Sequence, residues 1–163
     1  MNFMSSVLLF LVIATPWMVA QTPDPYAGLR RYLGTWSYEG EGGGGKVTCQ
    51  SQRRLIANGY FVESHRECLT PNGPITQVEV FGYSVEHRVY RYWGFNGRVV
   101  STYAAASIGE VIVWVGEGIS AGNRCTEMLS PGRKSSTDIC EHSSDGGKTW
   151  VRLSGGTSRR TAW

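Results

Sequence analysis

Apolar and polar residues alternate along most of the chain after Trp36, in short runs interrupted by glycine, proline, asparagine and aspartate. Alternation with a period of two is typical of β-strands that bury one face, and turn signals about 8–12 residues apart are typical of sandwiches and barrels. The pattern predicts an all-β fold, and the absence of an internal repeat argues against a propeller or a solenoid. The ten strands expected are 35–41, 46–57, 60–69, 75–83, 88–95, 98–106, 110–116, 123–130, 135–142 and 148–158.

The segment before Trp36 has the signals of a short helix. Asp24 suits an N-cap, Pro25 is favoured at the first helical position, and Gly34 ends the segment. We therefore expect about two helical turns over 25–33, directly before the first strand.

Residues 1–20 contain no charged side chain, and 7–14 form one unbroken apolar run. This run is too short for a membrane span, which needs roughly 20 residues. Pro16 follows it, and Ala20 precedes Gln21, as at a signal-peptide cleavage site. We predict a signal peptide over 1–20 and one exported domain over 21–163 without an integral membrane span. The alternative is a buried N-terminal strand.

The length and charge of the chain limit the number of domains and the kinds of partner that it can bind. A chain of 163 residues, shortened by a signal peptide, suits a single domain that buries a core. Its net charge of +3 is small and spread over many segments. Nucleic-acid binding needs a concentrated basic surface, so we exclude that class of partner. The oligomeric state stays open.

Four cysteines follow the predicted signal peptide, and an even number in an exported chain is typical of disulfides. If Asn58-Gly59 forms a two-residue turn, residues whose numbers sum to 117 face each other across the hairpin. Cys49 and Cys68 meet this condition. We therefore predict the disulfide Cys49–Cys68.

The second pair follows from the next-to-last hairpin. If the chain turns at Gly132-Arg133, residues whose numbers sum to 265 face each other, as Cys125 and Cys140 do. Facing residues of an antiparallel pair are close enough for a bridge. We therefore predict the disulfide Cys125–Cys140.

The same registers set charged residues against each other. Arg54 faces Glu63, which is a favourable pair, whereas Glu127 faces Asp138, which is repulsive. Either this carboxylate pair binds something or a bulge shifts the register there.

A short helix followed by Gly34-Thr35-Trp36 at the first strand resembles the opening of calycin barrels, the lipocalin superfamily. The resemblance implies an antiparallel barrel in which Trp36 closes one end and an arginine of the last strand, Arg159 or Arg160, packs across it. Further segments resemble an uncharacterised bacterial lipocalin-like family, domain of unknown function 1579, which brings no established activity. They are 33–36, 80–83, 88–93 and 143–160.

Two glycine-rich motifs are interpreted as turns. Residues 40–46 nearly match nucleotide-binding loops, but these need a following helix, and Val47 stands where a phosphate loop has Ser or Thr. Residues 143–150 match the Asp-box of sialidase propellers, but only once, so we expect a hairpin in which Asp145 accepts backbone hydrogen bonds and Trp150 packs beneath.

The sequence Glu63-x-His65-x-Glu67 places three ionisable side chains on one strand face. If that face points inward, His65 with Glu63 and Arg54 suggests a general base of an isomerase or hydrolase, or a metal ligand. The alternative is a solvated outer face. His87 lies near a turn, and we predict no metal site and no cofactor.

Aromatic residues are concentrated in the central strands, where they either fill the core or line a cavity. We predict a non-catalytic protein that binds a small apolar or amphipathic ligand inside the barrel, and a structural or partner-binding envelope protein is a further alternative. No Gly-x-Ser-x-Gly motif or free thiol supports nucleophilic catalysis. The ligand-binding candidates are Arg54, Glu63, His65, Arg91, Tyr92, Trp93 and Tyr103.

Overall fold

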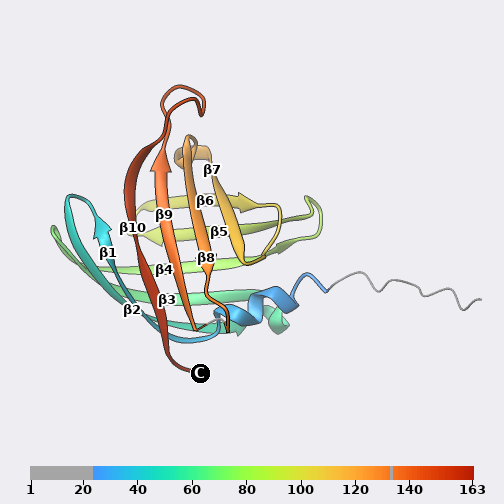
Figure 1. Cartoon of the computed structure of the whole chain (residues 1–163). Helices are drawn as coiled ribbons and strands as arrows, with labels where there is room; N and C mark the ends of the chain where they lie inside the picture. The colour runs from blue at the N-terminus through green and yellow to red at the C-terminus, as the bar shows by residue number, and fades with distance from the viewer. Residues whose placement is uncertain (1–23, 133) are drawn as a thin grey trace, which may run out of the picture.

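The computed structural model describes residues 24–132 and 134–163, in which ten antiparallel strands close into one barrel (Figure 1). The predicted all-β fold is therefore confirmed. The order around the barrel is β1-β10-β9-β8-β7-β6-β5-β4-β3-β2, so each strand pairs with its sequence neighbours and β10 returns to β1. The expected signal peptide, 1–20, lies outside the described residues.

Strand positions follow the alternation of the sequence except at the last strand. This strand begins three residues later than expected, because 143–150 form a loop, and it extends further so that its end pairs with β1. The strands are β1 (Gly34–Gly42), β2 (Gly45–Ile56), β3 (Phe61–Thr70), β4 (Gly73–Ser84), β5 (Val89–Asn96), β6 (Val99–Ala105), β7 (Val111–Glu117), β8 (Asn123–Leu129), β9 (Ser135–His142) and β10 (Val151–Ala162).

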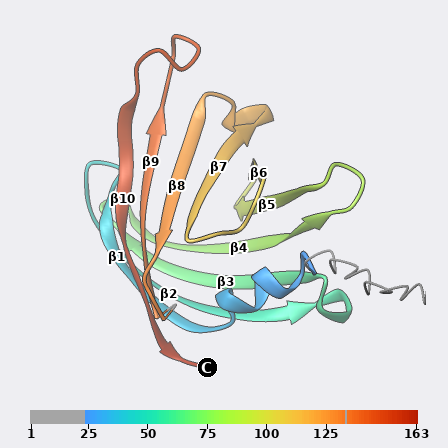
Figure 2. The same ribbon diagram turned by 45° about the vertical axis from the view of Figure 1, so that its right-hand side comes forward.

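Within the described residues, helix is limited to three short 3-10 segments, η1 (Ala27–Tyr32), η2 (Ala57–Gly59) and η3 (Gly118–Ser120). The expected N-terminal helix is thus present, but as a 3-10 helix. Figure 2 shows η1 at the lower end of the barrel, close to the chain's C-terminus. No helix in the described part is long and apolar enough to cross a bilayer.

The Trp36 side chain closes this end of the barrel and is almost completely buried. Its indole N–H donates to the Tyr32 carbonyl at 3.0 Å. The Arg160 guanidinium lies 4.7 Å from the indole centroid, whereas Arg159 is exposed. Arg160 is therefore the arginine of the last strand that packs across Trp36. Gly34 has a φ of +103°, which favours glycine at this entry to β1.

The two disulfides have the predicted pairing. Cys49 faces Cys68 and Cys125 faces Cys140, with Cα–Cα distances of 4.1 and 4.0 Å. The register of the first hairpin is confirmed, but its turn is wider than two residues, because Ile56 and Phe61 are the last facing pair and η2 lies between them.

The barrel interior changes from apolar to polar along its length. Residues nearest η1 form the hydrophobic core, which includes Leu29 of the helix and inward-facing Val62, Phe81 and Ile112. The inward positions farther from η1 are polar or charged; on β3, for example, the inward residue after Val62 is Ser64. The core thus occupies the η1 end and leaves the other half of the barrel polar.

Both glycine-rich motifs form turns. Gly43 and Gly44 have φ of 60° and 88° and join β1 directly to β2, so no helix follows and the nucleotide-binding reading is excluded. In the 143–150 loop, Asp145 accepts hydrogen bonds from the Lys148 and Thr149 amides at 3.0 and 2.9 Å. The Arg124 guanidinium lies 3.9 Å from the Trp150 ring centroid.

The outer face of β7 is apolar and exposed. Val111, Val113 and Val115 alternate with the inward Ile112 and Trp114. Only residues 115–117 of β7 pair with β6, the shortest pairing in the barrel. The partner-binding hypothesis expects an exposed apolar patch together with no usable cavity. The structure has such a patch, but it also has the cavity described below.

Candidate functional site

A cavity of about 280 Å³ lies in the polar half of the barrel, above the apolar core. Its size is just below the roughly 300–1,000 Å³ usual for drug-sized ligands. The lining combines aromatic rings, five charged side chains and one disulfide. These residues are Tyr32, Tyr38, Arg53, Arg66, Gln77, Glu79, Phe81, Tyr92, Ser101, Tyr103, Trp114, Cys125, Glu127, Ser136, Asp138, Cys140 and Ser158.

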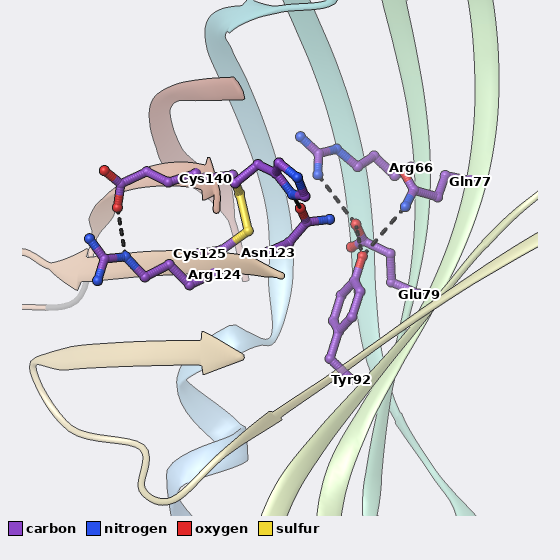
Figure 3. Close-up of a disulfide and its surroundings, with 10 residues drawn as sticks. Arg66, Gln77, Glu79, Tyr92, Asn123, Arg124, Cys125 and Cys140 are labelled. Atoms are coloured by element: carbon purple, nitrogen blue, oxygen red, sulfur yellow. Dashed lines mark hydrogen bonds and ion pairs between the residues drawn. A yellow bond between two sulfur atoms is a disulfide. The ribbon is translucent and has the colours of Figure 1, made fainter. Parts of the chain in front are cut away.

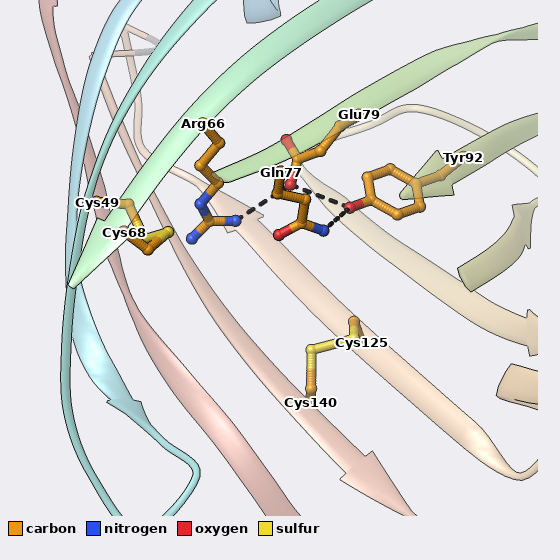
Figure 4. Close-up of polar contacts among 8 residues, drawn as sticks. All are labelled: Cys49, Arg66, Cys68, Gln77, Glu79, Tyr92, Cys125 and Cys140. Atoms are coloured by element: carbon orange, nitrogen blue, oxygen red, sulfur yellow. Dashed lines mark hydrogen bonds and ion pairs between the residues drawn. A yellow bond between two sulfur atoms is a disulfide. The ribbon is translucent and has the colours of Figure 1, made fainter. Parts of the chain in front are cut away.

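A hydrogen-bonded network centred on Glu79 forms one wall (Figure 4). Arg66 Nη1 lies 3.2 Å from Glu79 Oε1, and the Tyr92 hydroxyl donates to the same oxygen at 3.0 Å. Gln77 Nε2 donates to the Tyr92 hydroxyl at 3.4 Å. Because Glu79 is buried and has these partners, the network is a fixed polar surface.

Burial and charge pairing act in opposite directions on Glu79. Burial is the largest single effect and raises the pKa of this carboxyl, but the charges of Arg66 and Arg53 together with hydrogen bonds to the carboxylate outweigh it, so the pKa is lowered. Burial, reinforced by Glu79, raises the pKa of Tyr92 well above its usual value. At neutral pH the wall therefore consists of an ionised Arg66–Glu79 pair and a neutral Tyr92.

Glu127 and Asp138 form a carboxylate pair on the opposite wall. They face each other across β8 and β9, so the predicted register is confirmed and contains no bulge there. The Tyr32 hydroxyl donates to Glu127 Oε2 at 3.1 Å. Burial, with a contribution from Glu127, raises the pKa of Asp138 to about 6. The Asp138 carboxyl therefore titrates closer to neutral pH than an ordinary aspartate does.

The Tyr38 side chain lies along the cavity wall, where its own strand β1 and the neighbouring strand β10 carry glycine. A Cβ at Gly40 would be 2.5 Å from the Tyr38 hydroxyl, and a Cβ at Gly156 would be 2.7 Å from its Cζ. The Arg66 guanidinium lies 4.8 Å from the centroid of this ring, on the cavity side. The two glycines thus make room for an aromatic surface under Arg66.

The cavity also exposes the Cys125–Cys140 disulfide. Figure 3 shows it across the interior from Glu79 and Tyr92. Arg124 precedes Cys125 on β8 and Glu141 follows Cys140 on β9, and Arg124 Nε donates to Glu141 Oε2 at 2.8 Å on the outer face. Because successive side chains of a strand point to opposite faces, the ion pair lies outside the barrel and the disulfide lies inside.

Arg54, Glu63 and His65 lie on the outer face of the barrel and do not line the cavity. Arg54 Nη2 is 2.7 Å from Glu63 Oε2, and His65 Nε2 is 3.4 Å from the same atom. The Arg54 and His65 side chains are 72% and 55% exposed. Of the two alternatives, the structure has the solvated outer face, because Cys68 is inward and odd-numbered residues of β3 point the other way; this corrects the placement of these three residues among the ligand-binding candidates. The hydrogen bond from Arg54 holds the pKa of Glu63 below its usual value.

The other ligand-binding candidates divide between the two faces. Tyr92 and Tyr103 line the cavity, with ring centroids 5.8 Å apart. Arg91 forms an ion pair with Glu117 outside the cavity, and the Trp93 ring packs 6.4 Å from Phe61 on the outer surface. The structure therefore retains two of the seven candidates at the cavity and places the other five outside it.

Most polar residues of the cavity were not among the ligand-binding candidates predicted from the sequence. The cysteine pairs could have identified some of them, since residues that share a strand face with an inward disulfide also point inward. Residues an even number of positions from an inward cysteine share its face, and they include Arg53 on β2, Arg66 on β3 and Asp138 on β9. Within the described residues, no three His, Cys, Asp or Glu side chains form a group that could hold a metal.

These features define a small closed antiparallel barrel with a polar and aromatic internal cavity. No protein-family model and no curated protein matches the chain. Among solved structures, it is similar to a protein of unknown function from the DUF3598 family of Nostoc punctiforme, with 8% sequence identity and a TM-score of 0.27. The match covers 85% of this chain and 100% of that one. At this level of similarity it carries no argument about function, and membership of the 1579 family stays a prediction.

Proposed function

We propose that the protein is an exported, non-catalytic carrier with a calycin-type barrel, which binds a small amphipathic ligand in its cavity. The observation that carries this proposal is the division of the cavity lining into aromatic and charged parts. Tyr103 and Trp114 offer apolar contact, whereas Arg53, Glu79 and Asp138 offer charge. Such a combination is typical of sites that bury an apolar tail and orient a polar head.

The polar lining is preorganised, which supports binding rather than mere packing. Arg66 and Glu79 hold each other in place, and Tyr92 is fixed by its hydrogen bond to Glu79. A ligand therefore meets donors and acceptors that lose little conformational freedom on binding. A core selected only for stability would favour apolar side chains at these positions, because buried ion pairs contribute little net stability.

The proposed compartment rests on residues 1–20 and on the disulfides. Disulfides form and persist in oxidising compartments, and this chain has two. Intact-mass measurement of the protein from its host tests the proposal. A mature chain beginning near Gln21 with both bridges formed is expected, whereas a full-length chain with reduced cysteines would contradict export.

Ligand binding is tested on protein purified from its own host. Native mass spectrometry is expected to detect a bound mass that solvent extraction releases. Binding of an amphipathic fluorescent probe, 1-anilino-8-naphthalenesulfonate, should fall in Trp114→Ala, because Trp114 lines the cavity. The matched control is Trp93→Ala on the outer surface, which should leave probe binding unchanged. A protein with no bound mass and equal probe binding in both variants would overturn the proposal.

A further inference from the structure

Arg53 presents an unpaired guanidinium to the cavity. Within the described residues, it has no side-chain hydrogen bond or ion pair, and its Nε is buried without a partner. The guanidinium carbon lies 5.2 Å from the centroid of the Trp36 ring and 6.0 Å from that of Tyr32, so aromatic faces hold it in position. Buried polar groups normally have partners, and the forked donors of arginine suit a carboxylate. The Arg53 charge acts on Glu79 and Asp138 only from a distance, so its donors are free for an anion in the cavity.

Asp138 is the unpaired acidic counterpart. In the same described part of the chain, its carboxylate has no hydrogen bond or ion pair, and its neighbour Glu127 has only the Tyr32 hydroxyl. Two carboxylates on facing positions repel each other. A cationic nitrogen between them would remove that repulsion and receive charge-assisted hydrogen bonds. Arg66, Arg152 and Arg53 act on Asp138 only from a distance and form no ion pair with it, so this wall can take a cation.

Arg53 and Asp138 cannot satisfy each other. They lie on β2 and β9, with β1 and β10 between them in the barrel, and they form no ion pair. Arg66, the other cation of the cavity, is already paired with Glu79 at 3.2 Å. A head group with one charge would match one wall and leave the other unpaired. A head group that carries both charges on neighbouring atoms matches both walls.

We propose that the cavity selects an α-amino acid with an apolar side chain, whose carboxylate binds Arg53 and whose ammonium group binds Asp138 and Glu127. The apolar side chain packs against Tyr103 and Trp114. The cavity volume of about 280 Å³ sets an upper limit on the length of that side chain. This inference rests on the proposed ligand binding in the cavity and names its chemical class.

The experiment is calorimetric titration of delipidated protein with four probes that share an eight-carbon skeleton. They are 2-aminooctanoate, octanoate, octylamine and octanamide. We expect 2-aminooctanoate to bind at least about tenfold more tightly than the other three, since only it makes charge-assisted hydrogen bonds with both walls. Arg53→Gln and Asp138→Asn should each weaken its binding about tenfold or more. Arg54→Gln, an adjacent arginine on the outer face, should have no effect.

Thermal unfolding of each variant separates lost binding from lost folding, and Arg53→Lys provides a second readout. This variant keeps the charge and loses the forked donors, so its affinity should lie between those of wild type and Arg53→Gln. Equal or tighter binding of octanoate or octylamine would overturn the zwitterion inference while leaving the proposed carrier function intact. Failure of all four probes, together with no bound mass from the host, would overturn both.

Discussion

Asp138→Asn is expected to stabilise the protein at neutral pH. The Asp138 carboxyl has a pKa of about 6 in the folded protein, against an ordinary value of 3.8, chiefly because it is buried. Between these two pH values the folded state binds more protons than the unfolded state, so the free energy of unfolding falls as pH rises. The difference of about two pKa units corresponds to about 3 kcal/mol in the free energy of unfolding. This figure is an upper limit, because the Asp138 side chain retains some contact with solvent.

The measurement is urea unfolding of wild type and Asp138→Asn with the disulfides intact, followed by tryptophan fluorescence from pH 3 to pH 8. The two proteins should have similar stability near pH 3, where Asp138 is protonated in both states. The variant should become progressively more stable than wild type up to about pH 7, by at most about 3 kcal/mol. A difference that does not change with pH would refute the reasoning.

Asp145→Asn is the matched control because its pH dependence has the opposite sign. Hydrogen bonds from the Thr149 side chain and backbone hold the pKa of Asp145 well below its ordinary value. The stability that Asp145 contributes is therefore present at neutral pH and is lost as pH falls. The variant should be less stable than wild type at pH 7, and this deficit should shrink on acidification.

Three further outcomes are expected from unfolding measurements. Glu79→Gln leaves the buried Arg66 without its counter-ion and should lower the free energy of unfolding by about 3 kcal/mol, and the double variant with Arg66→Gln should recover part of that loss. Removal of the second disulfide by Cys125→Ser with Cys140→Ser should cost about 3 kcal/mol in urea, and an unchanged midpoint would contradict a bridge in the native protein. Gly34→Ala should lower the melting temperature, because its φ is +103° and a Cβ would lie 2.3 Å from a carbonyl oxygen of β10; an unchanged temperature would show that the entry to β1 relaxes freely.

The hairpin registers could be predicted because they depend on local information. Turn residues and a strand period of two fix which residues face each other, and the cysteines provide an independent check. Cys49 therefore faces Cys68 as predicted, even though the turn beside η2 is wider than expected. The repulsive Glu127–Asp138 pair was also visible in the sequence, although its location inside the barrel was not.

The all-β class, the positions of most strands and the two disulfide pairings could be predicted from the residues alone. The sequence did not determine which face of β3 is inside, because both faces are polar: His65 and Glu67 alternate with Ser64 and Arg66. Closure of the sheet into a barrel decided this, since it turns Arg66 and Glu79 of the paired strands β3 and β4 toward the interior and leaves His65 in solvent. Hydrophobic periodicity identifies a buried face only when that face is apolar, and this barrel buries charged residues in its cavity.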